Sequence, residues 1–273
     1  MAAGDERLIE VEKLVVRYGA RTVLKGIDFD VRAGEIMVIM GGSGSGKSTL
    51  MRHLLALERA ASGAIRVLGK DIAKLTTLEQ IDLYKRVGVA FQSGALFSSM
   101  TVGENIMLPL AEHTELDQQT MEIMMRMKLE VVDLAGFERL MPAELSGGMI
   151  KRAALARAIV MDPRILFCDE PSAGLDPVVS DQLDDLLLRL RGAMDMSIVV
   201  VTHELESAFK IADRITILDR GEVLMVGTVD EIRASRNERI QNILNRRSEE
   251  EVLDPDAYLQ RLTGIQVEVE PPL

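Results

Sequence analysis

The sequence predicts an α/β fold: a mainly parallel sheet, an antiparallel β layer at the N-terminal end, and an inserted helical subdomain. Apolar and charged residues alternate at 8–17 and 22–31, which is typical of half-buried antiparallel strands. From 36 to 218, apolar runs alternate with helical stretches, which indicates a parallel sheet covered on both faces. The stretch at about 93–160 is patterned as helix instead and predicts the inserted subdomain.

The same patterns place the individual elements. Further strands are predicted at 36–40, 64–68, 86–91, 164–168 and 196–201, and a hairpin at 215–218 and 223–226. Helices are predicted from 50 onward and at 149–161, 178–191 and 204–211, with Ser146 as the N-cap of the helix at 149–161. Within the subdomain, we expect Pro109, Gly136 and Pro142 to break the helical structure.

The Met-rich stretch at 121–134 is compatible with two roles. In the role that we favour, its side chains fill the core of the helical subdomain. In the other, they form an adaptable contact face for a partner helix.

The C-terminal part of the chain differs in composition from the rest. The stretch at 233–251 is dense in charge and predicts a helix, Asp254-Pro255 predicts a break, and the tail from 266 is acidic. We interpret the acidic run at 248–251 as a solvated face. The chain is therefore divided into a main domain, 1–240, and a C-terminal extension, 241–273.

Composition excludes several classes of protein. The net charge of −11 and the 3% aromatic content, without Trp, argue against a nucleic-acid partner, which needs a basic surface and stacking side chains. The single cysteine, Cys168, lies in an apolar run, and we interpret it as a core residue. The N-terminus has no secretion signal, and no apolar run approaches the ~18–20 residues that span a bilayer. A role at a membrane would therefore need a partner that holds the chain there.

A glycine-rich loop separates the apolar run at 36–40 from the helix predicted after it. The loop reads Gly41-Gly42-Ser43-Gly44-Ser45-Gly46-Lys47-Ser48-Thr49. Glycines let backbone N–H groups close around an anion, and the helix N-terminus adds positive potential. Lys47 can reach the β- and γ-phosphates, and the Ser48 hydroxyl can bind Mg²⁺. A flexible linker is the alternative, but linkers do not usually join a buried strand to a helix. The sequence predicts a P-loop NTPase core.

Polar residues end three of the predicted strands. Asp169 and Glu170 follow the apolar strand at 164–168; the first suits Mg²⁺, and the second can polarise an attacking water. His203 and Gln92 end two other strands, at the edge where parallel sheets bind ligands. The alternatives are surface charge for the carboxylate pair and a structural role for the histidine. We favour a nucleotide site.

A second glycine pair lies in Leu145-Ser146-Gly147-Gly148-Met149, at the start of another predicted helix. It is a second anion-binding end. One site cannot easily use two such ends of the same chain. We therefore expect a second copy of the chain to complete the site.

The order of these motifs over about 7–230 resembles the ATP-binding-cassette ATPase family. The motifs are Tyr18, the loop at 41–49, Gln92, 145–149, Asp169-Glu170, 172–176 and His203. The resemblance implies ATP and Mg²⁺ as cofactors and a head-to-tail homodimer around two ATP molecules. It implies an ATP-binding set of Tyr18, Gly41 to Thr49, Ser146, Gly147, Gly148 and Asp176. It implies a catalytic set of Lys47, Gln92, Glu170 and His203, and a metal set of Ser48, Gln92 and Asp169.

Within these sets the resemblance implies individual roles. Tyr18 stacks on adenine, and Glu170 is the catalytic base. His203 contacts the γ-phosphate, Asp176 lies at the dimer interface, and Ser146 and Gly148 reach the γ-phosphate of the partner's ATP. The sequence departs from the family at Met149, where most members have Gln. A thioether cannot donate a hydrogen bond, so we expect a cost of around 1 kcal/mol at that contact and retained hydrolysis.

Three segments, 91–97, 108–114 and 140–149, resemble more narrowly the ATPases of the Mla phospholipid-trafficking (MCE-type) transporters. This implies a subunit on the cytoplasmic face of a bacterial inner membrane that drives phospholipid transport and maintains outer-membrane lipid asymmetry. The implied partners are a permease dimer, a periplasmic MCE-type lipid-binding protein and a small cytoplasmic regulator. Leu96, Phe97 and Met100 either form an apolar groove for a permease helix or pack internally.

Two alternative functions stay open. An ATPase for amino-acid or other small-solute uptake would carry the same general motifs. A cassette of DNA repair or translation would also carry them, but the single cassette, the absence of heptads and the acidic charge disfavour it.

Overall fold

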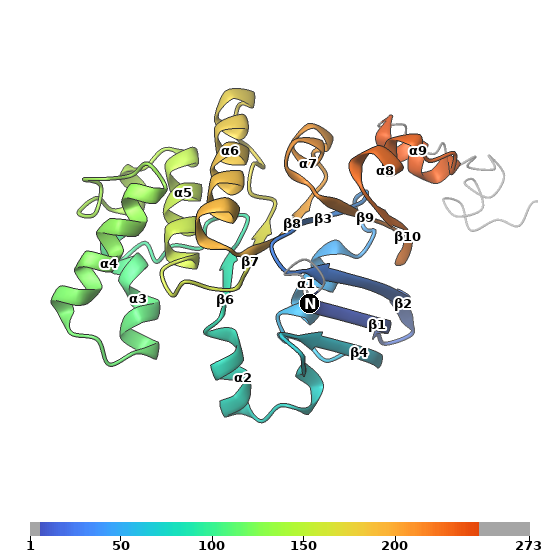
Figure 1. The fold of residues 1–273 in the computed structure, drawn as a ribbon, viewed down its shortest axis with the longest axis horizontal. Helices are drawn as coiled ribbons and strands as arrows, with labels where there is room; N and C mark the ends of the chain where they lie inside the picture. The colour runs from blue at the N-terminus through green and yellow to red at the C-terminus, as the bar shows by residue number, and fades with distance from the viewer. Residues whose placement is uncertain (1–5, 246–273) are drawn as a thin grey trace, which may run out of the picture. The chain divides into compact units, whose positions relative to one another are not determined.

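A computed structural model of the chain describes residues 6–245. The chain divides into a compact unit that ends at Ser235 and a second unit that begins at Arg236, and each is described by itself. The first unit contains two β-sheets, with helices α3 to α5 grouped at one side (Figure 1). This arrangement confirms the predicted α/β fold with its antiparallel layer and helical subdomain.

The larger sheet has six strands in the order β10-β9-β3-β8-β7-β6. Its strands run parallel except for β10, which pairs antiparallel with β9. All residues of β3 and β8 are buried, as expected of a parallel sheet covered on both faces. The strands are β3 (Ile36–Met40), β6 (Val87–Ala90), β7 (Ile165–Asp169), β8 (Ser197–Thr202), β9 (Arg214–Asp219) and β10 (Glu222–Gly227).

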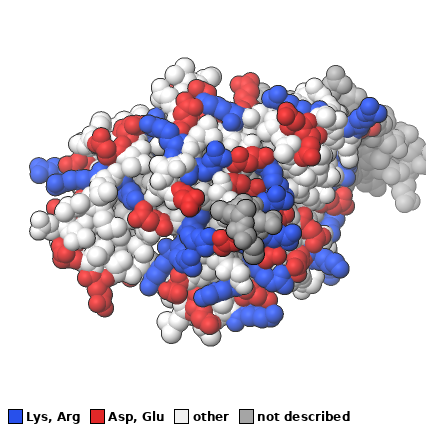
Figure 2. All heavy atoms as spheres, in the orientation of Figure 1, with Lys and Arg blue, Asp and Glu red and all other residues white. Residues whose placement is uncertain are grey.

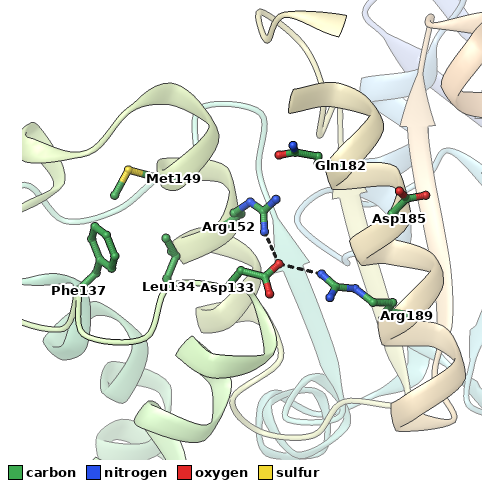
Figure 3. A pocket seen from close by; sticks show the side chains of 8 residues that line it. All are labelled: Asp133, Leu134, Phe137, Met149, Arg152, Gln182, Asp185 and Arg189. Atoms are coloured by element: carbon green, nitrogen blue, oxygen red, sulfur yellow. Dashed lines mark hydrogen bonds and ion pairs between the residues drawn. The ribbon is translucent and has the colours of Figure 1, made fainter. Parts of the chain in front are cut away.

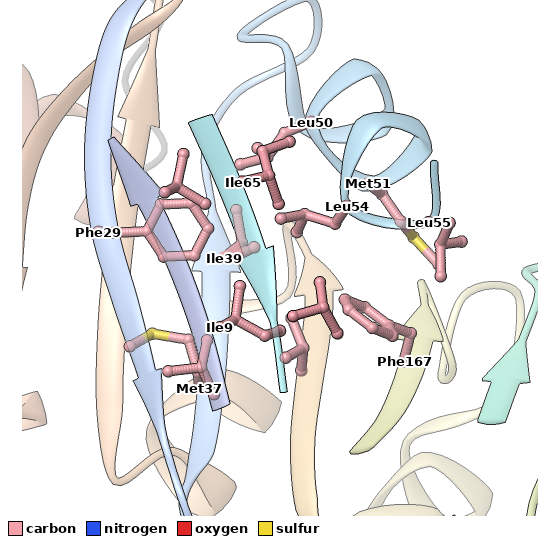
Figure 4. Close-up of a cluster of buried hydrophobic side chains, with 14 of the residues drawn as sticks. Ile9, Phe29, Met37, Ile39, Leu50, Met51, Leu54, Leu55, Ile65 and Phe167 are labelled. Carbon is pink, nitrogen blue, oxygen red and sulfur yellow. The ribbon is translucent and has the colours of Figure 1, made fainter. Parts of the chain in front are cut away.

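The smaller sheet is antiparallel, in the order β2-β1-β4-β5. Its strands are β1 (Arg7–Tyr18), β2 (Arg21–Arg32), β4 (Ser62–Val67) and β5 (Lys70–Asp71). Helix α1 (Lys47–Leu54) packs between the two sheets, where Leu50 and Leu54 lie beside Ile65 of β4 (Figure 4). Phe167 of β7 belongs to the same buried cluster. Each such side chain contributes roughly 1.5–3 kcal/mol when fully buried. This packing fixes where the glycine-rich loop between β3 and α1 lies.

The remaining helices cover the larger sheet or form the subdomain. They are α2 (Thr77–Tyr84), α3 (Val102–His113), α4 (Gln118–Val131), α5 (Gly147–Ala158), α6 (Pro177–Met194), α7 (Leu205–Ile211) and α8 (Val229–Ala234), with 3₁₀ turns at Ile72–Lys74 and Pro142–Glu144. Helix α5 contacts α3 and α4 as well as β6 and α6. It therefore connects the subdomain to the larger sheet.

The prediction that Pro109 breaks the helical structure is wrong, because Pro109 lies inside α3. Proline lacks the N–H that would bond to the carbonyl of Asn105, four residues earlier. Val102, Ile106 and Leu110 of the same helix are buried. Their packing against α4 and α5 offsets the lost hydrogen bond.

The Met-rich stretch falls mostly in α4, and only part of it is core. Met125 is buried, together with Leu129, as predicted. Met127 is 61% exposed, and Ile123 is 52% exposed. The interpretation as core is therefore wrong for Met127, because one face of α4 has no other element packed on it within the described residues.

The continuous helix predicted at 233–251 is also wrong over its described part. Helix α8 ends at Ala234, and α9 (Glu238–Leu244), in the second unit, begins anew. Asn237 caps α9, since its side-chain oxygen accepts hydrogen bonds from the N–H groups of Arg239 and Ile240. The predicted features at 248–251, 254–255 and 266–273 lie outside the described residues, and the division at 240 stays a prediction.

Two further expectations concern the core and the surface. Cys168 is fully buried in β7, and burial raises the pKa of its thiol to about 12, so its interpretation as a core residue is confirmed. Within residues 6–245, no helix combines the length and apolarity that crossing a bilayer requires. On the face shown in Figure 2, Lys and Arg gather near the middle, with Asp and Glu among and around them.

Candidate functional site

The loop after β3 leads into α1 without a side-chain cap. Gly46 is the N-cap residue, with φ of 110°, a backbone conformation that favours glycine. A Cβ on Gly41 would overlap the carbonyl oxygen of Leu218 in β9. The sequence therefore folds into a tight turn that leaves the first N–H groups of α1 uncapped by any side chain.

Two polar side chains of this loop fit a phosphate chain. The Nζ of Lys47 donates to the carbonyls of Gly41 and Gly42, at 2.7 and 3.0 Å. Burial lowers the pKa of Lys47, and the charges of Glu170 and Asp169 oppose that shift. The Ser45 hydroxyl oxygen is buried and, among the described residues, has no hydrogen-bond partner. A cation and an unsatisfied hydroxyl inside a glycine-rich turn are suited to an anion.

The carboxylate of Glu170 is held at both oxygens. His203 Nδ1 lies 2.8 Å from its Oε1, and the Thr202 hydroxyl donates to its Oε2 at 3.1 Å. The Glu170 side chain is 12% exposed and the His203 side chain 62% exposed. Glu170 also has a φ of 46°, in the left-handed region that non-glycine residues rarely adopt. The carboxylate is therefore oriented at the sheet edge, beside an exposed imidazole.

Asp169, the last residue of β7, is the second acidic group of this edge. Burial raises the pKa of Asp169, as does the charge of Glu170, whereas Lys151 and Lys47 lower it. Strands β3 and β7 run parallel on either side of β8, so the Lys47 loop, Asp169 and Glu170 lie at the same edge of the sheet.

The predicted metal site has only three protein ligands. Ser48 lies in the first turn of α1, Gln92 lies just after β6, and Asp169 ends β7. Residues 6–245 contain no cluster of three or more His, Cys, Asp or Glu that could hold a metal ion. One hydroxyl, one amide and one carboxylate fit Mg²⁺, which binds few protein groups and keeps waters and substrate phosphates.

Gln92 begins a segment that α5 holds by two basic side chains. The Nζ of Lys151 donates to the Gln92 carbonyl, and Arg157 donates to the carbonyls of Ala95 and Gly94, at 2.7 and 2.9 Å. Phe97, in the same segment, is 52% exposed, whereas Leu96 and Met100 are half-buried. The three apolar side chains predicted as a groove are thus neither fully internal nor fully exposed.

A second group of predicted residues lies where α5 and α6 begin. The Ser146 hydroxyl caps α5 by accepting from the Met149 N–H, at 3.3 Å. The Asp176 carboxylate caps α6 by accepting from the N–H groups of Val178 and Val179, each at 3.1 Å. A Cβ on Gly148 would lie 2.7 Å from the Val179 side chain, so the two helix starts pack closely. The structure therefore brings Ser146, Gly147 and Gly148 beside the Asp176 loop.

Tyr18 lies at the end of β1. The residue is 46% exposed, and its hydroxyl donates to Glu58, which also accepts from Arg52 at 3.3 Å. The hydrogen bond to Glu58 raises the pKa of Tyr18. The ring therefore has an anchored hydroxyl and an accessible face.

A pocket of about 630 Å³ lies along α5 and α6 (Figure 3). Its lining residues are Asp133, Leu134, Phe137, Met149, Arg152, Gln182, Asp185 and Arg189. Arg152 and Arg189 point toward Asp133 from these two helices and bind its carboxylate at 2.7 and 2.8 Å. Met149 lines the pocket together with Leu134 and Phe137, so its thioether is in apolar surroundings. No sequence motif indicated this pocket.

Two residues of the site escaped sequence analysis. Thr202 binds Glu170, and Lys151 binds the backbone of both Gln92 and Glu170. The available signals were a threonine directly before His203 and a lysine in a helix with buried Ala153 and Leu155. Neither signal identifies a partner that is distant in sequence.

Comparison with known proteins gave consistent matches. A family model described as ABC transporter matches residues 24–173. The intermembrane phospholipid transport system ATP-binding protein MlaF of Haemophilus influenzae is 38% identical over 245 residues, 90% of this chain and 93% of that protein. MlaF of Escherichia coli K12 is 37% identical over 238 residues, 87% of this chain and 88% of that protein. The probable ribonucleotide transport ATP-binding protein mkl of Mycobacterium leprae is 37% identical over 249 residues, 89% of this chain and 72% of that protein.

Two solved structures have the same fold. The dimeric ATP-binding cassette MJ0796 bound to ADP and Pi has a TM-score of 0.74 and 28% identity, and covers 81% of this chain and 98% of its own. The cbiO1 protein of Clostridium perfringens, part of the cbiONQ ABC transporter complex, has a TM-score of 0.79 and 26% identity, and covers 96% of this chain and 100% of its own.

Proposed function

The chain belongs to the ABC transporter family as an ATP-hydrolysing, ATP-binding subunit, and from this premise we propose that it drives phospholipid transport between bacterial membranes. It acts on the cytoplasmic face of the inner membrane, as one of two copies beneath a permease dimer. The transport maintains the lipid asymmetry of the outer membrane. The geometry around Glu170 and Lys47 supports the ATPase part of this proposal, and likeness to the phospholipid transport proteins supports the cargo.

In this proposal the loop at 41–49 and the uncapped end of α1 bind the triphosphate. Lys47 exchanges its hydrogen bonds to the Gly41 and Gly42 carbonyls for bonds to the β- and γ-phosphates. Tyr18 stacks on the adenine through its accessible face. Ser48, Gln92 and Asp169 would hold Mg²⁺, which would neutralise part of the phosphate charge.

Glu170 acts as the catalytic base, and the hydrogen bonds at its two oxygens carry this assignment. Thr202 and His203 fix the carboxylate plane, so that one oxygen can accept a proton from a water molecule. As that proton moves to Glu170, the water oxygen bonds to the γ-phosphorus and the bond to the β-phosphate oxygen breaks. Because His203 is exposed, its other ring nitrogen contacts the γ-phosphate while Nδ1 stays on Glu170.

The second group of residues serves the partner copy. Ser146, Gly147 and Gly148 begin α5, and Asp176 begins the adjacent α6, so they form one continuous edge. In the head-to-tail homodimer this edge contacts the γ-phosphate bound by the other copy. ATP closes the dimer, and hydrolysis opens it.

The segment after β6 transmits this movement to the permease. The Asn105 side chain accepts from the Phe97 N–H at 2.7 Å and donates to the Phe97 carbonyl at 3.1 Å. It therefore fixes the backbone of an exposed aromatic residue in the segment that begins at Gln92, where a short permease helix could dock. A periplasmic MCE-type lipid-binding protein and a small cytoplasmic regulator complete the proposed assembly.

Co-purification from native membranes tests the cargo. The tagged chain is extracted in mild detergent, and its partner proteins and lipids are identified by mass spectrometry, with the detergent extract of an untagged strain as the control. A multi-span permease, a lipid-binding periplasmic partner and enriched phospholipid are the expected result. A soluble solute-binding protein without enriched lipid would contradict the proposal and favour small-solute uptake, which the 37% identity to a probable ribonucleotide transport protein also permits.

A further inference from the structure

Lys151 is a buried cation in the middle of a helix. It lies in α5 and is 9% exposed, among buried Ala153, Ala154 and Leu155 of the same helix. A buried ammonium group is unfavourable unless its donors are satisfied, and lysine has three of them. The contacts of Lys151 therefore need an explanation.

The Lys151 ammonium joins two adjacent strand ends of the larger sheet. It donates to the carbonyl of Gln92, just after β6, and to the carbonyl of Glu170, just after β7, the latter at 3.1 Å. Strands β6 and β7 are neighbours and run parallel, so these carbonyls lie at the same edge. One side chain of the helical subdomain thus binds the backbone of a proposed metal ligand and of the proposed catalytic base.

Glu170 is the residue of this edge that most needs support. Its φ of 46° is strained for a residue with a side chain, and such strain persists only where surrounding contacts hold it. Its N–H donates to the Val201 carbonyl at 2.8 Å, and its own carbonyl also accepts from the Ala173 N–H at 3.2 Å. Lys151, from α5, adds a contact from outside the sheet and its loops.

Charge favours the same arrangement. Burial lowers the pKa of Lys151, and the nearby charges of Asp169, Glu170 and Glu204 oppose that shift. These acidic groups therefore offset part of the cost of burying the ammonium charge.

We propose that Lys151 is a positioning residue that couples the orientation of α5 to the geometry of Gln92 and Glu170. The same helix begins at Ser146, so the end offered to a partner copy and the catalytic edge are linked through about one and a half turns of α5. A movement of α5 that withdraws Lys151 releases both carbonyls. This inference rests on the ATPase site proposed above.

Three variants test the role: Lys151→Met, which removes the charge and the donors, Lys151→Arg, which keeps both, and Arg152→Met as a control. Arg152 is the next residue of α5 and binds the Val132 carbonyl and Asp133, away from the catalytic edge. Two quantities are measured: kcat and KM for ATP, and amide hydrogen exchange of peptides covering 88–96 and 166–174 in the nucleotide-free chain.

For Lys151→Met we expect kcat to fall about tenfold or more, KM to change less than about threefold, and both peptides to exchange faster. Lys151→Arg should restore kcat to within about threefold and restore the exchange rates, because the guanidinium keeps the charge and several N–H donors. Arg152→Met should leave kcat and the exchange of both peptides unchanged. If Lys151→Met does not fold, Lys151→Gln, which keeps a shorter, uncharged amide as a donor group, should give values between those of the wild type and full loss.

Wild-type kcat and exchange in Lys151→Met would overturn the proposal. An equal loss in Arg152→Met would also overturn it, because the effect would then be general to α5. Exchange is measured without nucleotide, so it tests Lys151 even if the wild-type chain failed to hydrolyse ATP, a result that would instead contradict the proposed function.

Discussion

The two helices α1 and α5 both begin at glycine-rich turns, yet their first turns are completed differently. Helix α1 starts after Gly46 and has no side-chain cap, whereas α5 starts after Ser146, whose hydroxyl accepts from the Met149 N–H. An uncapped N-terminus leaves N–H groups for an anion, and a capped one is already partly satisfied. The difference suggests a division of tasks: α1 binds ATP in the single chain, and α5 takes part only when two chains meet.

The side chains around the two helix ends support this division. Near α1 lie Lys47, Asp169 and Glu170, which influence one another electrostatically. Near α5 lies Asp176, which is occupied as the cap of α6. The charged chemistry is therefore concentrated at the α1 end, and the α5 end is built from small and capping residues.

Glu170→Gln should give the largest effect, because it stops the reaction while leaving both helix ends intact. Without a carboxylate base we expect turnover to fall by about 10²–10⁴-fold, the range for general acid–base catalysis. ATP binding, measured with a fluorescent analogue, should be retained within a few-fold. Retained turnover would rule out Glu170 as the base.

Lys47→Met should weaken ATP binding at the start of α1 and leave the start of α5 unchanged. Charge-assisted hydrogen bonds contribute about 1.5–3 kcal/mol each, so we expect ATP affinity to fall by roughly 10–100-fold. The rise in Tm that ATP gives to the wild-type chain should then be lost at the same ATP concentration. An unchanged ATP-induced shift would show that Lys47 does not bind the phosphates.

Ser146→Ala should remove the N-cap of α5 and leave the ATP-binding loop before α1 unchanged. Loss of the N-cap should lower the free energy of unfolding by about 1 kcal/mol, seen as a Tm lower by roughly 2–4 °C. ATP affinity of the single chain should stay unchanged, whereas ATP-dependent association should weaken. A loss of ATP affinity in the dilute single chain would mean that α5 contributes to the same chain's site.

Met149→Gln should give the smallest effect, and it tests how much one side chain at the start of α5 adds to the contact with the partner's nucleotide. Glutamine adds a donor for the partner's nucleotide, worth about 1 kcal/mol, so association should strengthen by up to roughly fivefold. The gain is limited because Met149 lines an apolar part of a pocket with Leu134 and Phe137. A large increase in ATP turnover would contradict this estimate.

Most of the α1 end could be predicted from the sequence because its chemistry is local. The strand, loop and helix at 36–54 are consecutive, and the apolar strand that ends in Asp169 and Glu170 marks a sheet edge by itself. Such short-range patterns determine strand ends and turns, and they place the residues that follow.

The features that could not be predicted from the sequence depend on contacts between distant parts of the chain. Lys151 and Gln92 are 59 positions apart, and Thr202 and Glu170 are 32 apart, so no spacing indicates either pair. Pro109 stays within α3 because of packing against other helices, and the break before α9 depends on a cap that competes with helix continuation. These features are set by tertiary structure, which outweighs local propensity.

Sedimentation of the Glu170→Gln chain with and without ATP and Mg²⁺ tests most directly whether the two helix ends come together from two copies. We expect a single chain without nucleotide and a dimer with one ATP bound per chain. Adding Ser146→Ala to this variant should weaken the dimer while ATP stays bound. The protein concentration is raised to the local concentration that two copies would have beneath one permease dimer. If the chain then binds one ATP but keeps the mass of a single chain, the two helix ends do not come together from two copies.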